Sequence, residues 1–140
     1  MLNILDEKTL MDMTRKAVDE KLKECADDLL DESKRRVPVH DGTLRDSGLD
    51  SPDYELQTET FRVWKVWFDT RPLTGKPFNY AVIRHEVPPK AGSGLADHTK
   101  FLENPCKEKV LLYASIIESG AIEGLTSVRA FPTVIITPKK

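Results

Sequence analysis

The chain has 140 residues, of which 39% are hydrophobic and 31% are charged, and its net charge is −2. This length fits one domain with one core, and no apolar run reaches the roughly 20 residues that cross a bilayer. The start, MLNILDEK, lacks the basic and apolar stretches of a secretory signal. We therefore expect synthesis in a cytoplasm, and the near-neutral charge gives no global signal for nucleic acid.

Charge is unevenly divided along the chain. Residues 1–60 hold 16 acidic and 9 basic side chains, which gives −7, and residues 61–140 hold 7 acidic and 12 basic side chains, which gives +5. Oppositely charged halves can attract each other between neighbouring subunits. An equally good interpretation is that both halves are solvated faces.

A long N-terminal helix is predicted over residues 6–36, because apolar residues recur there at helical spacing. Pairs such as Asp12 and Lys16 lie four residues apart in the favoured orientation. Three basic residues suit the C-terminal end of the helix, and Pro38 ends it, since the residue before a proline avoids the helical region.

A turn is predicted next, at Asp41-Gly42. Thr43 is expected to cap a single helical turn that contains Leu44 and Arg45. From there to Asp53 the sequence predicts a loop.

Two candidate strands, 54–59 and 61–69, predict an antiparallel pair. On the second strand, alternate residues from Trp64 point to one face, and Lys65 and Trp67 lie on the other. Trp67 beside Lys65 is expected to be a partly exposed aromatic side chain, which is a feature enriched at interfaces. The alternative is a covering layer within the same subunit.

The stretch after the strands is predicted to be a loop over residues 71–77, followed by a short helix over residues 80–86. Asn79 can cap this helix, and Tyr80 and Ile83 fit its period. A strand is the alternative for residues 80–86.

Residues 87–99 carry prolines, glycines and few large apolar groups. Such a segment buries too little surface to offset its ordering entropy, and a loop this long in a small domain is functional or disordered. The segment lies between two compact anchors, residues 80–86 and 100–105. We interpret it as an arm that is mobile in the isolated subunit and becomes ordered against a partner.

The last helix is predicted to begin at Asn104-Pro105, with the asparagine as its cap, and to end near Ser119 with Gly120 as terminator. Its apolar stripe is broad, so it should be buried deeply or shared with a neighbour. Residues 127–137 predict a final strand, in which Pro132 marks an edge or a bulge. The fold class is therefore α+β, with a small antiparallel sheet packed against a long N-terminal helix and a C-terminal helix.

The sequence contains little that indicates catalysis or metal binding. No HExxH, CxxC, phosphate-binding loop or GxSxG motif is present. Cys25 and Cys106 are expected to be reduced, half-buried thiols. A metal-dependent hydrolase is the less favoured hypothesis, and its candidate ligands and general acids and bases are His40, Asp41, His85, Glu86, Asp97, His98 and Glu103. The favoured interpretation is that His85 and Glu86 position the arm by hydrogen bonds and that Glu103 caps or pairs locally, so no catalytic residue, metal or cofactor is predicted.

Three short segments occur in a suggestive order. The first is Val37–Ser47, a "TGxLRxS"-like segment in which Asp41-Gly42 replaces Thr-Gly; the second is "YAxxxHE"-like, with Tyr80, Ala81, His85 and Glu86; the third is "KFLExP"-like, with Lys100, Phe101, Leu102, Glu103 and Pro105. In this order, over about residues 10–118, they resemble the minor capsid or tail-completion (head–tail joining) proteins of long-tailed phages. The chain after Gly120 is longer than the resemblance explains.

The resemblance implies an α+β subunit of the virion that catalyses no reaction. It implies a homo-oligomeric, sixfold ring between the head connector and the tail tube, through which DNA passes without specific binding; a tail terminator or tail-tube subunit is the alternative. The candidate interface residues are Leu44, Arg45, Trp67, Tyr80, His85, Glu86, Lys100, Phe101, Leu102 and Glu103.

Overall fold

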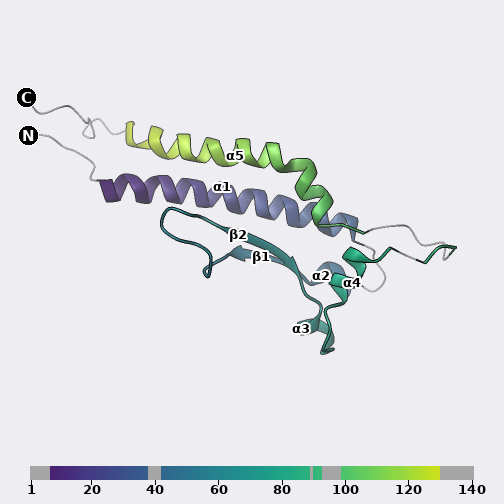
Figure 1. The fold of residues 1–140 in the computed structure, drawn as a ribbon. Coiled ribbons are helices and arrows are strands. Elements are labelled where there is room, and N and C mark those ends of the chain that lie inside the picture. Colours follow the sequence, from purple (N-terminus) through teal and green to yellow (C-terminus); the bar gives the residue numbers. More distant parts are fainter. Residues whose placement is uncertain (1–6, 38–41, 89, 93–98, 130–140) are drawn as a thin grey trace, which may run out of the picture. The chain divides into compact units, whose positions relative to one another are not determined.

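The computed structural model describes residues 7–37, 42–88, 90–92 and 99–129. Two long helices, three short helices and a two-stranded antiparallel sheet make up these residues, so the predicted α+β class is confirmed (Figure 1). In chain order the elements are α1 (Glu7–Arg36), α2 (Thr43–Asp46), β1 (Gly48–Pro52), β2 (Trp64–Phe68), α3 (Arg71–Thr74), α4 (Tyr80–Glu86) and α5 (Glu103–Arg129).

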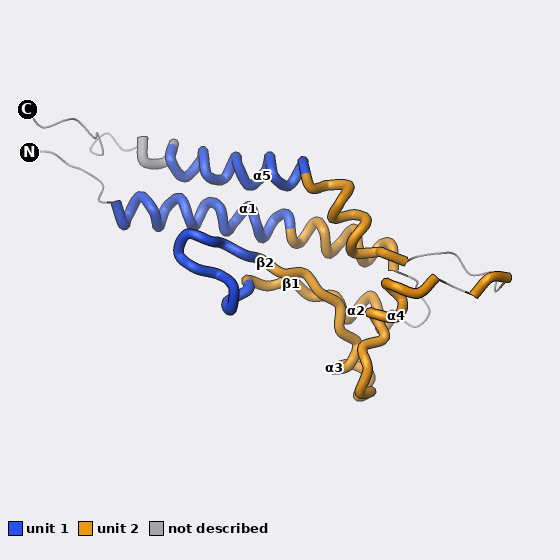
Figure 2. Tube along the Cα trace, viewed as in Figure 1, with its two compact units in different colours: residues 1–25, 53–63, 111–140 blue, residues 26–52, 64–110 orange. Residues whose placement is uncertain are grey.

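The chain separates into two compact units, coloured differently in Figure 2. Unit 1 is Met1–Cys25, Asp53–Val63 and Leu111–Lys140, and unit 2 is Ala26–Pro52 and Trp64–Val110. The helices α1 and α5 each contribute residues to both units. That the chain is one domain stays a prediction.

Unit 2 contains the sheet and the main core. Strand β1 pairs antiparallel with β2, from Gly48 opposite Phe68 to Pro52 opposite Trp64. A Cβ atom at Gly48 would lie 2.6 Å from the Phe68 ring and 2.8 Å from Leu30, so a larger residue here would have to displace these core side chains. The buried cluster beside it consists of Val37, Leu44, Phe68, Ala81 and Phe101.

The predicted partner of β2 was wrong. The pairing strand is β1, in the stretch expected to be a loop, whereas residues 54–56 form a turn and residues 57–59 are irregular. The reason is Asp53, whose Oδ1 accepts hydrogen bonds from the backbone N–H groups of Glu55 and Leu56, both at 3.2 Å. Such a local bond offers the backbone an alternative to a strand ladder. Of the predicted strand 61–69, residues 64–68 are confirmed.

The predicted helices α2 and α4 are confirmed. Two predictions beside them, the cap of α2 and the loop before α4, need correction. Gly42, at φ 83°, precedes α2 and no side chain caps it, so Thr43 is the first helical residue. Residues 71–77 were expected to be a loop, but one helical turn, α3, occupies the first four and ends at Gly75 with φ 68°.

The C-terminal helix is longer than predicted. It begins at Glu103, so Asn104 lies inside its first turn, and it continues through Gly120 to Arg129. The predicted strand 127–137 is therefore wrong over residues 127–129, and residues 130–140 lie outside the described part of the chain.

Gly120 packs two helices together within unit 1 instead of ending one. A Cβ atom there would lie 2.9 Å from the carbonyl oxygen of Ala17 on α1, and one at Gly124 would lie 2.7 Å from the Cα of Thr14. The broad apolar stripe of α5 is divided, since Tyr113 is buried and Leu111 is 83% exposed.

Candidate functional site

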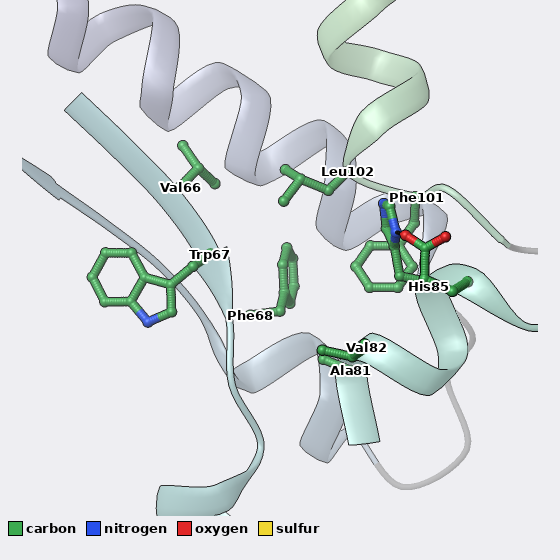
Figure 3. Close-up of a pocket in the computed structure, with 9 residues that line it drawn as sticks. Val66, Trp67, Phe68, Ala81, Val82, His85, Phe101 and Leu102 are labelled. Carbon is green, nitrogen blue, oxygen red and sulfur yellow. Dashed lines mark hydrogen bonds and ion pairs between the residues drawn. The ribbon is translucent and has the colours of Figure 1, made fainter. Parts of the chain in front are cut away.

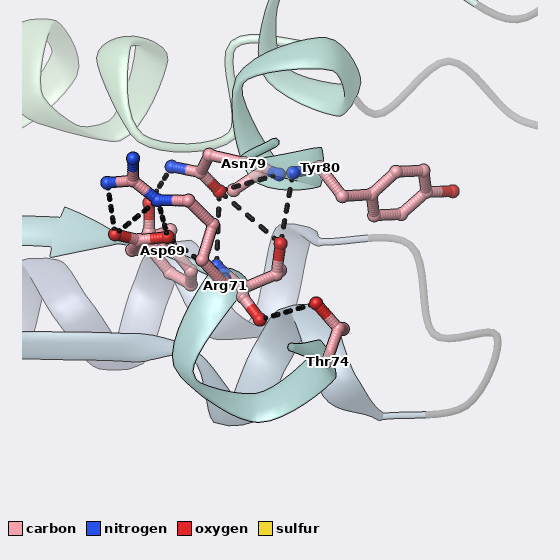
Figure 4. Close-up of polar contacts among 8 residues, drawn as sticks. Asp69, Arg71, Thr74, Asn79 and Tyr80 are labelled. Carbon is pink, nitrogen blue, oxygen red and sulfur yellow. Dashed lines mark hydrogen bonds and ion pairs between the residues drawn. The ribbon is translucent and has the colours of Figure 1, made fainter. Parts of the chain in front are cut away.

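Asn79 joins the end of β2 to the start of α4 (Figure 4). Its Oδ1 accepts from the backbone N–H of Ala81 and of Thr70, each at 3.1 Å, and its Nδ2 donates to the carbonyl oxygen of Phe68 at 2.9 Å. Thr70, which is 1% exposed, accepts the N–H of Tyr80 on its Oγ1 at 3.0 Å. The first turn of α4 is thereby fixed to the sheet, as the predicted cap requires.

Four residues at the two ends of the arm meet, and we call them the clamp: His85, Glu86, Lys100 and Glu103. The backbone N–H of Lys100 donates to the carbonyl oxygen of His85 at 2.8 Å, and the N–H of Glu103 donates to His85 Nε2 at 3.2 Å. The Lys100 ammonium pairs with the carboxylate of Glu86, and it lies 3.2 Å from that of Glu103. The clamp therefore closes the chain on both sides of residues 87–99.

The hydrogen bonds of His85 define its tautomer. Because Nε2 accepts an amide proton, the ring proton belongs on Nδ1, which lies 2.8 Å from Glu86 Oε1 and donates to it. The His85 ring also meets the Phe101 ring edge-on, with centroids 5.1 Å apart. Phe101 is 2% exposed, and its ring centroid lies 5.0 Å from that of Phe68. The polar clamp therefore packs directly on the core of unit 2.

The clamp is a network of opposite charges. Lys100, and then His85, lower the pKa of the Glu86 carboxyl, while Lys107, and then Lys100, lower the pKa of Glu103. Glu86 in turn raises the pKa of Lys100. Because these groups are exposed, salt screens them and each pair contributes little to stability. Lys100 has φ 58°, in the left-handed region that non-glycine residues seldom adopt, and the chain turns there towards α5.

A pocket of about 240 Å³ opens beside the clamp (Figure 3). Trp67 at its wall is half-buried, as expected, and the Nζ of Lys65 lies 4.9 Å from its ring centroid. The lining is mostly apolar and consists of Val66, Trp67, Phe68, Ala81, Val82, His85, Glu86, Phe101 and Leu102.

The structure brings most of the predicted interface residues to this one place. The seven that line the pocket or form the clamp are Trp67, His85, Glu86, Lys100, Phe101, Leu102 and Glu103. Of the other three, Leu44 is buried in the core, Arg45 is exposed, and the Tyr80 hydroxyl accepts a hydrogen bond from Arg84. Their role as an interface stays a prediction.

Metal binding has no site among the described residues, where no three His, Cys, Asp or Glu side chains gather closely enough to hold an ion. Both ring nitrogens of His85 are engaged within the clamp. The other candidate ligands, His40, Asp41, Asp97 and His98, lie outside the described residues. No helix in the described ranges is long and apolar enough to cross a membrane.

Comparison with known families gives a match over the first third of the chain. Residues 6–48 match the HK97-gp10_like family model, described as "Bacteriophage HK97-gp10, putative tail-component". This part of the chain is similar to a phage tail component. The match covers α1, α2 and the first residue of β1, it agrees with the predicted resemblance, and it supports a structural role in a phage virion. No curated protein and no solved structure gives a significant match.

Proposed function

We propose that this chain is a head–tail joining, or tail-completion, subunit that forms a sixfold ring between the head connector and the tail tube. The observation that carries the proposal is the clamp, found in a chain whose first third matches a phage tail component. The clamp holds residues 85 and 100 together. The segment between them therefore begins and ends at the same place in unit 2.

The arm, residues 87–99, is the proposed contact with a neighbouring subunit or with the connector. Because the clamp already holds residues 85 and 100 together within one subunit, docking has fewer backbone positions to fix, which lowers the entropic cost of association. No bond is made or broken, and docking alone drives the joining step.

Charge supports contact between copies only in part. Arg62 of the basic half pairs with Asp19 of the acidic half at 2.7 Å within unit 1, and Lys109 pairs with Asp28 at 2.8 Å within unit 2. These pairs satisfy some of the opposite charge inside one chain. We propose that the opposite charge which is not offset in this way attracts neighbouring subunits in the ring to each other.

A deletion of residues 90–97 tests this function in phage that depend on a supplied copy of the gene. The deletion should leave the fold intact, because the Lys100 N–H and His85 carbonyl already hold the ends together. The matched control replaces the same eight positions with a Gly/Ser segment of equal length, which keeps the span and removes the side chains. We expect both variants to melt as the parent does and to leave filled heads and finished tails unjoined in micrographs. Normal infectivity of the deletion variant would refute the joining role.

The same micrographs separate the alternative, a tail terminator or tail-tube subunit, which the description "tail-component" also fits. A phage lacking the whole gene should make overlong tails if the chain stops tube growth, and no tails if the chain builds the tube. Finished tails of normal length beside free heads are the result that the joining role requires.

A further inference from the structure

The loop between the two strands is held by hydrogen bonds and yet exposes large apolar side chains. We call residues 53–61 the hairpin loop. In it Tyr54 is 78% exposed, Leu56 61% and Phe61 60%. Its nine residues include three acids, Asp53, Glu55 and Glu59, and no base, which gives −3.

Hydrogen bonds hold the hairpin loop in one shape. The N–H of Phe61 donates to Thr58 Oγ1 at 2.9 Å, and the N–H of Thr58 donates back to the Phe61 carbonyl at 2.8 Å. Arg62 binds both carboxylate oxygens of Asp19 on α1, at 2.8 and 2.7 Å, and the Thr58 carbonyl at 2.9 Å. A rigid loop loses little entropy when it binds, and exposed aromatic anchors are typical of binding hot spots.

The pocket of unit 2 has the complementary character. A cavity of about 150 Å³ with an apolar lining can hold benzene, so the pocket, at about 240 Å³, can take one large apolar side chain. The segment that forms its β2 and α4 walls, residues 64–86, holds four bases and two acids, which gives +2; one of the acids is Glu86, which pairs with Lys100. Among these bases, Lys65 is exposed beside Trp67.

We propose that the hairpin loop of one copy docks on the pocket of a second copy, with an apolar side chain of the loop in the pocket and its acids facing Lys65 and the neighbouring bases. A second copy is the occupant that the opposite charges of the loop and the pocket walls support, because every copy carries both surfaces. Within its own chain the loop is held on α1 by Arg62 and by the bond from Arg15 Nε to the Glu59 carbonyl, at 2.9 Å. Two different surfaces then meet, which is a head-to-tail contact. The inference rests on the proposed ring, because a head-to-tail contact builds a ring only where its rotation closes after a whole number of copies.

Disulfide trapping between two chains tests this contact even if it is weak. The parent carries Cys106→Ser, since Cys106 is exposed, and keeps the buried Cys25. One tagged chain carries Leu56→Cys and the other Val82→Cys, at a pocket residue that is 57% exposed; the matched control carries Ile122→Cys, also 57% exposed. We expect the Leu56→Cys and Val82→Cys mixture to form the mixed dimer about tenfold faster than the control mixture, the ratio that 1.4 kcal/mol of specific binding gives.

Charge reversal adds a second readout. Glu55→Lys on the loop chain should slow trapping several-fold, and Lys65→Glu on the pocket chain should restore it, because complementary charges set the rate of encounter. Failure of the second reversal to restore trapping counts against the assigned pairing.

The contact is overturned if no mixed dimer forms, if the control mixture is trapped equally fast, or if Leu56→Cys chains pair mainly with each other. It is also overturned if a chain that carries both Leu56→Cys and Val82→Cys forms a disulfide only within itself. The joining role is tested separately, by the micrographs of phage that carry the deletion of residues 90–97. Trapping together with normal joining by the deletion variant keeps the contact and rejects the proposed function, and loss of joining without trapping does the reverse.

Discussion

Two phenylalanines show how differently the two units use the same side chain. Phe101, in unit 2, is 2% exposed and packs edge-on against Phe68 and His85. Phe61, in the hairpin loop of unit 1, is 60% exposed, although both of its backbone polar groups are hydrogen-bonded to Thr58.

The difference separates residues that complete the fold from residues left for a partner. In the core cluster, burial of apolar surface supplies stability. In the hairpin loop, hydrogen bonds and the Arg62–Asp19 pair maintain the shape, so the apolar side chains are not needed for it. The three exposed apolar side chains of the hairpin loop are therefore available for the contact proposed above.

Matched substitutions at these two positions give the largest expected effect. Phe101→Ala leaves a cavity in the core and should lower the free energy of unfolding by about 3–5 kcal/mol. Phe61→Ala removes an exposed ring and should change it by about 0.5 kcal/mol or less. Urea unfolding followed by circular dichroism measures both. A large loss at Phe61 would mean that the hairpin loop packs within the subunit, and the comparison would fail.

Two asparagines sharpen the same distinction between residues that are part of the fold and residues that are not. Asn79→Ala removes the cap of α4 and leaves the N–H of the buried Thr70 without its acceptor, which should cost about 1–3 kcal/mol. Asn104→Ala, at an exposed position inside α5, should cost about 0.5 kcal/mol or less. Thermal and urea unfolding compare them. Equal losses would show that Asn104 acts as the cap that its sequence context suggests.

What the sequence predicted correctly depends on local signals. The 3.6-residue spacing gave α1, and an asparagine before an apolar period gave α4 and its cap. Residues 80–86 and 100–105, which flank the arm, carry the hydrogen bonds of His85 and Glu86; that these bonds position the arm stays a prediction.

The features that could not be predicted from the sequence depend on contacts between residues far apart in the chain. Strand β1 has little strand propensity of its own, and it forms because Gly48 lets it approach Phe68 and Leu30. Gly120 carries the usual signal of a helix end, but the close approach of α1 makes it a packing residue. Thr70 gave no signal, since its importance comes from burial beneath Asn79 and Tyr80.

The smallest expected effect is the response of the clamp to acid. The pKa values of Glu86 and Glu103 are lowered in the folded chain, so their contribution to stability is present above their unfolded pKa and is lost as the pH falls through the folded pKa. The advantage of the parent over Glu86→Gln should therefore be constant near neutral pH and shrink as the pH falls from about 4. Unfolding in urea at several pH values measures this difference, and about 1 M salt, where the Debye length is about 3 Å, should reduce it at neutral pH. Because the clamp is exposed while the core cluster is not, this loss should leave the folded population of unit 2 intact. Because glutamine keeps nearly the shape of glutamate, an advantage that survives both acid and salt would mean that the charge of Glu86 is not its source, and the ion pairs of the clamp would lose their assigned role.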